Sequence, residues 1–388
     1  MGERKKQAVL AISGYNIRAI IAFCRWATDR QLPFYLVASG EDDPIFLTSY
    51  ADRVVSTRGS KSLSVQQFRD WYNLLKAKKS CDEVLILPST EYLNRFLLDN
   101  RAELEASNYI IPLAGRELYE RISDKYSFVK MCRSNGLDVP DEWDQPPGSF
   151  PYVAKPRTYR TKNGKILAPQ LIMNFSDHVK FLNQRNSADH FYQEYVEGRS
   201  IYLLAYIGRN KAEDRLYSQE NLMQQAGGGS ILLAAHCDFH HQNLAQRYVS
   251  MLRKYGFHGL IMVELRYNPS KEKYYMIEAN PRLWGPMQFC VDNRIDLFGS
   301  MMRDYDFELP EQSRELSSMQ PSNRKFYYWS GGLTADSSPP AYHSYSRDQY
   351  EQDLTALHSH DLFNRNDTIK LYLKEAGVRH SYEIYSVA

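Results

Sequence analysis

The segment spanning residues 264–282 carries the residue types most able to do chemistry in this chain. It contains two apolar, strand-like runs separated by a polar turn near residues 270–271, with one acid in each run. If the two runs pair as antiparallel strands about that turn, Glu264 and Glu278 lie roughly opposite each other. Asn280 then follows Glu278 on the same face, because side chains alternate with a period of two. The spacing therefore brings three oxygen-bearing side chains together.

Two carboxylates and an amide in this arrangement favour a divalent cation. Like charges that face each other across a strand pair are destabilising, so stability alone would not favour the pair. Mg²⁺ uses one or two carboxylates together with phosphate oxygens and water, and it would reverse that cost. We therefore expect Glu264, Glu278 and Asn280 to bind Mg²⁺ or Mn²⁺, with Arg282 placed to hold an anionic group. The spacing also allows a solvated face or a salt-bridge partner.

Composition limits the classes of protein that can carry such a site. The chain has 388 residues, 43% of them hydrophobic and 24% charged, which predicts a globular protein of two or three domains. A formal charge of +2 argues against nucleic acid and anionic membrane as partners. No apolar run approaches the length that spans a bilayer. Five scattered cysteines indicate buried free thiols in a reducing compartment, and we interpret the protein as cytoplasmic.

The first 115 residues alternate between strand-like and helix-like patterns, which is typical of a parallel α/β sheet. The expected strands are 8–12, 34–38, 53–55 and 84–87, and the expected helices are 17–28 and 65–76. The first strand-to-helix turn lacks the three glycines of a dinucleotide fingerprint, so NAD is not expected. Ser89 and Thr90 follow another strand, where they contact a substrate or cap the next helix.

The middle of the chain predicts a second set of elements. We expect a helix from about Ser123 to Asn135, with Ser123 as its N-cap and Gly136 after its end. Further strands are expected at 152–155, 191–196, 200–207, 231–236 and 259–267, with 191–196 and 200–207 forming a hairpin across residues 197–198. Helices are expected at 242–255 and 349–357. Glycines 227–229 either approach a substrate or join two strands.

The order of these pieces resembles the ATP-grasp superfamily over residues 1 to about 305. The resemblance rests on a strand ending Ala-Lys155-Pro, the run Gln-Glu-Tyr-Val-Glu-Gly at 193–198, and Glu278-Ala-Asn-Pro-Arg-Leu-Trp-Gly. The last motif is similar to the carboxylate–amine ligase branch near carbamoyl-phosphate synthetase and D-aspartate ligase. The implied fold combines α/β and α+β parts. It has an N-terminal parallel α/β pre-ATP-grasp domain (1–115), an ATP-grasp domain of two α+β lobes enclosing the nucleotide (116–310), and a C-terminal extension (311–388).

The resemblance also implies roles for single residues. Lys125 would touch phosphate, and Lys155 would bridge the α and β phosphates of ATP. The stretch connecting the two lobes would read the adenine edge and approach the ribose; it comprises Gln193, Glu194, Tyr195, Val196 and Glu197. Glu264, Glu278 and Asn280 match the magnesium ligands, and Arg282 matches the arginine that stabilises the transferred phosphoryl group.

The expected activity is ATP-dependent joining of a small carboxylate to an amine, such as an amino acid or a peptide-like acceptor. The carboxylate would be activated as an acyl phosphate, and ADP and phosphate would be released. A homodimer would be unsurprising. Two other functions stay open: a phosphotransferase acting on a hydroxyl, and a non-catalytic nucleotide-binding module. The loop 156–165 has one glycine where many relatives have several, so its closure over phosphates would rely on Arg157, Arg160 or Lys162.

Overall fold

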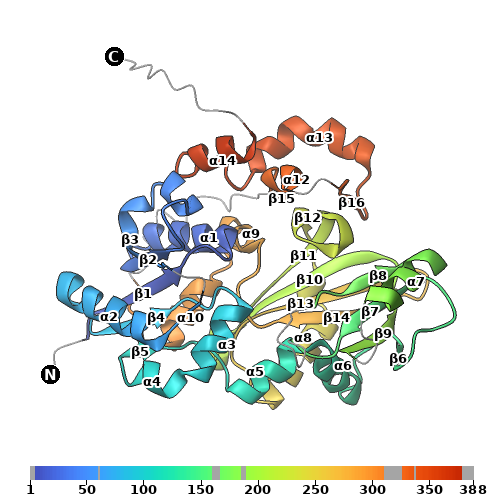
Figure 1. Cartoon of the computed structure of the whole chain (residues 1–388), viewed down its shortest axis with the longest axis horizontal. Coiled ribbons are helices and arrows are strands. Elements are labelled where there is room, and N and C mark those ends of the chain that lie inside the picture. Colours follow the sequence, from blue (N-terminus) through green and yellow to red (C-terminus); the bar gives the residue numbers. More distant parts are fainter. Residues whose placement is uncertain are drawn as a thin grey trace.

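The computed structural model describes residues 5–59, 62–159, 167–184, 189–309, 326–335 and 338–377. Three β-sheets organise these residues: a five-stranded sheet, a four-stranded sheet and a seven-stranded sheet (Figure 1). No helix in the described ranges is long and apolar enough to cross a membrane.

The five-stranded sheet is parallel, as predicted from the first 115 residues. Its strands are β1 (Gln7–Ile12), β2 (Phe34–Ala38), β3 (Val54–Thr57), β4 (Glu83–Ile86) and β5 (Tyr109–Ile110), in the spatial order β3-β2-β1-β4-β5. Helix α1 (Ile17–Asp29) packs on one face, and α2 (Val65–Lys79), α3 (Glu91–Asp99) and α4 (Arg101–Glu105) contribute to the core on the other. Both faces are therefore covered, which explains why β1 is a nearly continuous apolar run.

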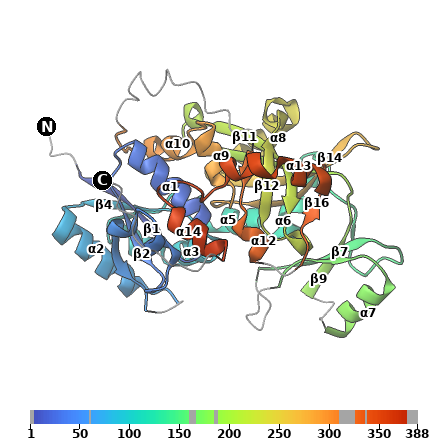
Figure 2. The same ribbon diagram turned by 90° about the horizontal axis from the view of Figure 1, so that it is seen from above.

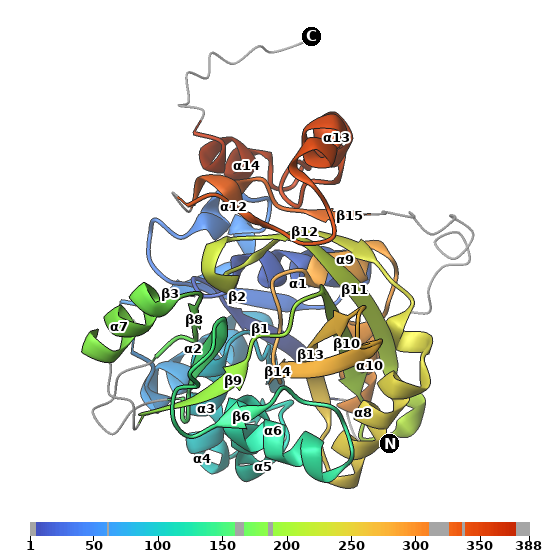
Figure 3. The same cartoon turned by 90° about the vertical axis from the view of Figure 1, so that its right-hand side faces the viewer.

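The four-stranded sheet forms the smaller of the two remaining sheets and lies beside the larger one (Figure 3). Its strands are β6 (Glu142–Trp143), β7 (Tyr152–Pro156), β8 (Gln170–Ile172) and β9 (His190–Glu194), in the order β6-β9-β7-β8. Helix α7 (Phe175–Gln184) follows β8, and Phe181 of that helix joins Tyr152, Ala154 and Tyr192 in a small separate core.

The seven-stranded sheet is antiparallel, and helices pack on both of its faces. Its strands are β10 (Arg199–Ile207), β11 (Arg215–Gln224), β12 (Ile231–His236), β13 (Gly259–Asn268), β14 (Lys273–Asn280), β15 (Phe326–Tyr328) and β16 (Ala341–Tyr342). One face packs on α6 (Lys125–Ser134) and α8 (Asn243–Lys254). The other face packs on α9 (Met287–Asp292) and α10 (Leu297–Asp304), which continue into the core under α1.

The expected hairpin across residues 197–198 is wrong. Strand β9 pairs with β6 and β7 in the small sheet, whereas β10 pairs with β11 and β13 in the large one. The backbone groups of β10 are paired with β11 on one edge and with β13 on the other, so no edge is left for β9. Gly198 has a φ of 130°, and a side chain there would meet the Tyr267 carbonyl oxygen. The chain turns from one sheet into the other at this glycine.

The expected N-cap of the helix near residue 125 is also wrong by one residue. Ser123 ends α5 (Arg116–Ser123), and Asp124 caps α6 by accepting a hydrogen bond from the Ser127 N–H at 2.8 Å. An aspartate at this position both satisfies a free N–H group and complements the helix dipole. The predicted end of the helix is confirmed, because Gly136 follows it with a φ of 70°.

The described part of the C-terminal region lies over α1 and the far edge of the large sheet (Figure 2). It contains α12 (Gly331–Thr334), α13 (Arg347–His360) and α14 (Ile369–Glu375), and α13 includes the predicted helix at 349–357. Buried Arg25 of α1 forms an ion pair with Asp367 at 2.7 Å and donates to Thr368 at 2.8 Å. These bonds attach the segment before α14 to the N-terminal part of the chain. All five cysteines are free thiols, and four of them are buried.

Candidate functional site

Strands β13 and β14 place the two glutamates opposite each other, as their spacing predicted. Glu264 and Glu278 are register partners, and Asn280 is the partner of Met262 further along the same pair. The register then shifts between Glu264 and Leu265, so that Ile277 is an extra residue in β14. Such a bulge turns the backbone locally and leaves a carbonyl group outside the regular ladder.

Glu278, Asn280 and Arg282 form one connected hydrogen-bonded chain. The Asn280 amide donates to one Glu278 oxygen at 2.8 Å, and the Arg282 guanidinium donates to the Asn280 side-chain oxygen at 3.1 Å. The second Glu278 oxygen is paired with the ammonium group of Lys125, at the first turn of α6. Arg282 also donates to the Leu283 carbonyl at 3.0 Å, which fixes its side chain beside the strand end. Four of the predicted site residues therefore lie together.

Glu264 lies deeper, with only 8% of its surface exposed. The Ser200 hydroxyl donates to its carboxylate at 3.4 Å, and the Arg266 guanidinium lies 3.8 Å away. A buried carboxylate needs such partners, because removal from water penalises its charged form. Glu264 therefore has polar partners on its own side of the sheet, opposite Glu278.

Lys155 reaches the same place from the small sheet. The residue is 4% exposed, and its ammonium group donates to the carbonyl of Ile277, the bulge residue, at 2.9 Å. Burial, together with the neighbouring charge of Lys125, lowers the pKa of Lys155 to about 7. Burial also lowers the pKa of Lys125 to about 8, against the opposing effect of Glu264 and Glu91. The two lobes thus meet where buried Lys155 and half-buried Lys125 lie close to acidic side chains.

The stretch predicted to connect the lobes does so. β9 ends at Glu194 in the small sheet and β10 begins at Arg199 in the large one, so the intervening residues pass from one sheet to the other. Gln193 is buried, and its side-chain N–H₂ group has no partner among the described residues. Val196 is buried as well, Tyr195 is half-buried and Glu197 is exposed.

The connecting stretch also touches the turn of the acidic hairpin. The Glu194 carboxylate pairs with Lys271 at 3.0 Å, and the Glu194 N–H donates to the Asp141 carbonyl at 2.9 Å. Lys271 lies in the loop between β13 and β14, far along the hairpin from Glu264 and Glu278. The lobe connection and the hairpin that carries the acidic pair are therefore in direct contact at the hairpin turn.

The oxygen set suits a hard cation better than zinc. Among the described residues, no group of three or more His, Cys, Asp or Glu side chains could hold a metal ion. Two facing carboxylates and one amide supply only part of an octahedral shell, and a nucleotide phosphate and water supply the rest in Mg²⁺ sites. The facing carboxylates, of which Lys125 neutralises only one, provide the charge that such a cation would balance.

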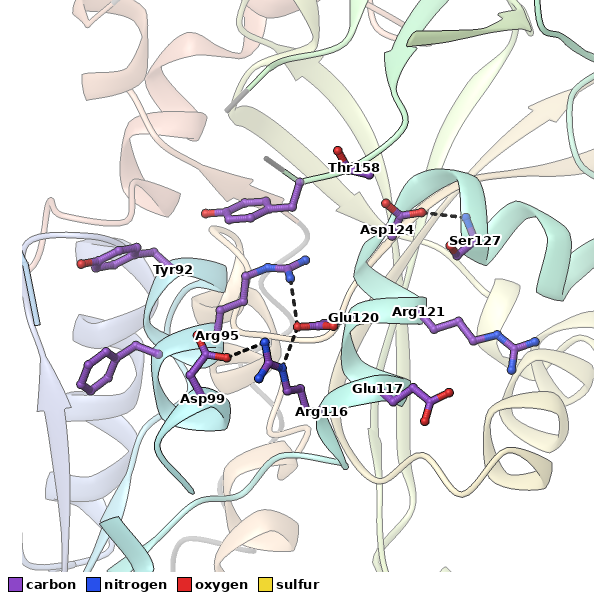
Figure 4. A pocket seen from close by; sticks show the side chains of 12 residues that line it. Tyr92, Arg95, Asp99, Arg116, Glu117, Glu120, Arg121, Asp124, Ser127 and Thr158 are labelled. Carbon is purple, nitrogen blue, oxygen red and sulfur yellow. Dashed lines mark hydrogen bonds and ion pairs between the residues drawn. The ribbon is translucent and has the colours of Figure 1, made fainter. Parts of the chain in front are cut away.

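A pocket of about 740 Å³ lies beside these residues, and the sequence did not predict it (Figure 4). It is bordered by α3, α5, the start of α6 and the two residues Thr158 and Tyr159 that follow β7. The lining residues are Tyr92, Arg95, Phe96, Asp99, Arg116, Glu117, Glu120, Arg121, Asp124, Ser127, Thr158 and Tyr159. Its wall therefore includes Asp124, which precedes Lys125, and Thr158, which follows Lys155 by three residues.

Arg95 is the most firmly held cation of this pocket. Its guanidinium pairs with Glu91 at 2.9 Å, lies 3.6 Å from Glu120, donates to Ser123 at 3.1 Å and stacks over the Tyr159 ring at 4.3 Å. One feature of the sequence could have indicated this pocket: Glu91 and Arg95 are four residues apart on the helix that follows a parallel strand. That helix is capped by Thr90, which confirms the capping alternative for this residue.

The remaining candidates have other partners, lie in a turn or fall outside the described residues. Arg157 pairs with Asp144 at 2.7 Å, whereas Arg160 and Lys162 fall outside the described ranges. Glycines 227–229 lie in the turn that joins the paired strands β11 and β12.

Comparisons by sequence and by structure give different outcomes. No family model matches the chain, and no curated protein matches it. Solved structures do match.

Pyruvate carboxylase from Rhizobium etli has a TM-score of 0.57 at 15% identity. The match covers 80% of this chain but only 29% of that enzyme. The biotin carboxylase domain of Hydrogenobacter thermophilus 2-oxoglutarate carboxylase, in complex with MgADP, ADP and bicarbonate, has a TM-score of 0.59 at 12% identity, with 81% of this chain and 72% of that chain covered.

A third match covers the two proteins equally. N5-carboxyaminoimidazole synthetase from Staphylococcus aureus has a TM-score of 0.56 at 15% identity, with 80% of each chain covered. At this level of identity the matches describe architecture. The three sheets, the link between the two antiparallel sheets and these solved structures agree with the resemblance seen in the sequence, and the chain has the ATP-grasp fold.

Proposed function

We propose that this protein is an ATP-dependent carboxylate–amine ligase that forms an amide through an acyl phosphate and releases ADP and phosphate. The observation that carries the proposal is the meeting of Glu264, Glu278 and Asn280 with buried Lys155 and half-buried Lys125 where the lobes join. Facing acids and a buried ammonium group that has no carboxylate partner among the described residues both cost stability. Such a combination favours a function in which charged ligands complete the site.

The oxygens of Glu264, Glu278 and Asn280 would hold Mg²⁺ together with the nucleotide. When bound, the cation would neutralise phosphate charge and favour transfer of the terminal phosphoryl group. The MgADP complex of the Hydrogenobacter domain supports this assignment, since that domain shares the fold.

The basic side chains would position the phosphates. Among the described residues Lys155 donates to one backbone carbonyl, so two donor positions can serve phosphate oxygens. Lys125 neutralises Glu278 and can exchange that partner for phosphate. Arg282, held by Asn280, presents a guanidinium group to the phosphoryl group as charge develops on it. Gln193 to Val196 would contact the adenine through backbone groups and the unpaired Gln193 amide.

The pocket beside Lys125 and Lys155 is the place that we propose for a substrate. Its volume lies in the range of small-molecule sites, and its mixed charges suit a polar carboxylate or amine. Arg95 is ordered in advance by its bonds to Glu91 and Ser123, so little entropy would be lost when it binds a carboxylate.

A phosphate-release screen tests the proposal. Purified protein with MgATP is incubated with pairs of amines and carboxylates drawn from amino acids, dipeptides and small acids, and products are identified by mass spectrometry. We expect phosphate release that needs both substrates and a product whose mass corresponds to their union minus water. The Glu278→Gln variant provides the background from contaminating phosphatases.

Other outcomes identify the other functions. A phosphorylated hydroxyl compound, formed without an amine, would indicate a phosphotransferase instead. Binding of ATP with no phosphate release for any pair would indicate a nucleotide-binding module.

A further inference from the structure

A line of buried polar side chains crosses the large sheet and ends on Glu264. The Gln219 amide donates to the Asn221 side-chain oxygen at 2.7 Å, and the Asn221 amide donates to the Ser200 hydroxyl oxygen at 2.9 Å. Ser200 then donates to Glu264 at 3.4 Å. Gln219, Asn221 and Ser200 have no exposed surface, and Glu264 is 8% exposed.

Strand register places all four side chains on one face. Ser200 of β10 is opposite Asn221 of β11, and Tyr202 of β10 is opposite both Gln219 and Glu264. Residues directly opposite or two apart in a sheet point to the same side. This is the side whose apolar residues pack on α9 and α10, so the polar line interrupts a hydrophobic layer.

Stability by itself does not account for this interruption. Buried amides and hydroxyls gain little over apolar side chains of similar size even when they are paired. Here the pairing is incomplete, because the Gln219 side-chain oxygen is buried and has no partner among the described residues. An unpaired buried acceptor is costly and calls for a reason other than packing.

The direction of the hydrogen bonds supplies that reason. Asn221 donates to Ser200, so the hydroxyl oxygen of Ser200 is engaged as an acceptor and its own proton remains for Glu264. Gln219 fixes the orientation of the Asn221 amide, since its N–H₂ group occupies the Asn221 oxygen. Every donor in the line points toward the carboxylate. Arg266, at 3.8 Å, adds charge near Glu264 without the direction of a short hydrogen bond.

We propose that Ser200, Asn221 and Gln219 are positioning residues that orient the Glu264 carboxylate for binding a divalent cation. The inference rests on the proposed function, because it needs the cation that Glu264 would share with Glu278 and Asn280. Partners beyond the ligands commonly fix ligand orientation, and their loss costs about 10- to 100-fold in metal affinity or activity. Ser200 acts directly on the carboxylate, and the two amides act through Ser200.

Direct measurement of metal binding tests the proposal without relying on turnover. Mn²⁺ is titrated into the protein saturated with ADP, and bound and free Mn²⁺ are distinguished by electron paramagnetic resonance. Ser200→Ala should weaken Mn²⁺ binding by about 10- to 100-fold, whereas ADP affinity without metal should be unchanged. Asn221→Ala should weaken Mn²⁺ binding less, because the Ser200 hydroxyl remains.

Ser218→Ala is the matched control. Ser218 is on β11 and fully buried like Ser200, but its hydroxyl donates to the Cys237 carbonyl at 2.6 Å. It should bind Mn²⁺ as the wild type does. The double variant Ser200→Ala with Asn221→Ala should bind Mn²⁺ no more weakly than Ser200→Ala alone, because the amide acts through the hydroxyl.

Two results would overturn the proposal. One is wild-type Mn²⁺ affinity in both Ser200→Ala and Asn221→Ala; the other is an equal loss of affinity in Ser218→Ala, which would indicate a general weakening of the sheet. Melting temperatures verify that each variant is folded, and Asn221→Ala provides the answer if Ser200→Ala does not fold. A wild-type protein that binds no Mn²⁺ in the presence of ADP would also remove the proposed metal site, so the two failures are distinguishable.

Discussion

The acidic and the basic halves of the candidate site are built in different ways. Glu264 and Glu278 are held by one strand pair, and each carboxylate has side-chain partners. Lys155 arrives from a separate sheet, and its one hydrogen bond among the described residues is to the Ile277 carbonyl. Lys125 comes from the first turn of α6 and shares the Glu278 carboxylate with Asn280. The acidic half is therefore secured by local pairing, whereas the basic half depends on the lobes being in place and on a ligand for its full set of bonds.

The largest effect is expected in the acidic half. Glu278→Gln keeps the shape of the side chain and removes one of the two facing charges, so the cation and the phosphoryl group lose a stabilising partner. Turnover should fall by about 100- to 1,000-fold. Steady-state phosphate release measures this. The variant should melt near the wild-type temperature, because a repulsion with Glu264 is removed along with the Lys125 ion pair. Unchanged turnover would contradict the metal assignment.

In the basic half, a variant that loses ligand binding should gain stability. Lys155→Met retains much of the side-chain volume and removes a buried charge, so nucleotide binding should weaken by about 2 kcal/mol or more. The free energy of unfolding should rise at pH 7, because one unit of pKa shift corresponds to about 1.4 kcal/mol. Chemical denaturation and nucleotide titration measure the two quantities. Loss of stability in this variant would mean that Lys155 supports the fold.

The pH dependence of stability sharpens the same comparison. Since burial lowers the folded-state pKa of Lys155 to about 7, the unfolded chain binds the extra proton between about pH 7 and 10. Wild-type stability should therefore gain a contribution as pH rises through this window, and Lys155→Met should lack it. Denaturation curves of both proteins across this pH window give the free energy of unfolding of each. The difference between the two values at each pH isolates the contribution of Lys155, because the titration of the other groups is common to both proteins.

A substitution in the pocket beside the lysines should change the KM of one substrate only. Arg95→Met removes a guanidinium that is held by Glu91 and Glu120, and a hydrogen bond to a charged group contributes about 1.5 to 3 kcal/mol. The KM for the carboxylate or the amine should rise about tenfold or more, whereas the KM for ATP should stay constant. Initial rates with each substrate varied in turn give both values. Equal changes in all KM values would indicate a general disturbance of the site.

The smallest effect is expected where the lobe connection meets the hairpin turn. Lys271 and Glu194 form an exposed ion pair, with 51% and 30% of their side chains exposed. Solvent screens such pairs, so they contribute little to stability. Lys271→Ala should therefore change the melting temperature and the KM for ATP only slightly, and raising the ionic strength should abolish the difference. A large loss of ATP affinity would show that the pair fixes the lobe connection.

Much of this architecture could be predicted from the sequence. The strands and helices of the parallel sheet follow from alternating apolar patterns, and the facing of Glu264 and Glu278 follows from two strands joined by a short turn. The placement of residues 191–196 and 200–207 in different sheets could not be predicted, because nearness in sequence favours a hairpin whereas both edges of β10 are taken by β11 and β13. The Arg95 pocket and the line from Gln219 to Glu264 also escaped prediction, since their members lie far apart in the chain.

By itself, the sequence determined the residues that can do chemistry and the strands that carry them. These follow from side-chain type and from periods of two and 3.6 residues, which are local properties of the chain. Tertiary structure alone decided which strand neighbours which, and it brought Lys125 and Lys155 to the acidic pair. The physical reason is that burial and charge pairing depend on contacts between residues that are distant in the sequence. A local pattern of side chains does not specify those contacts.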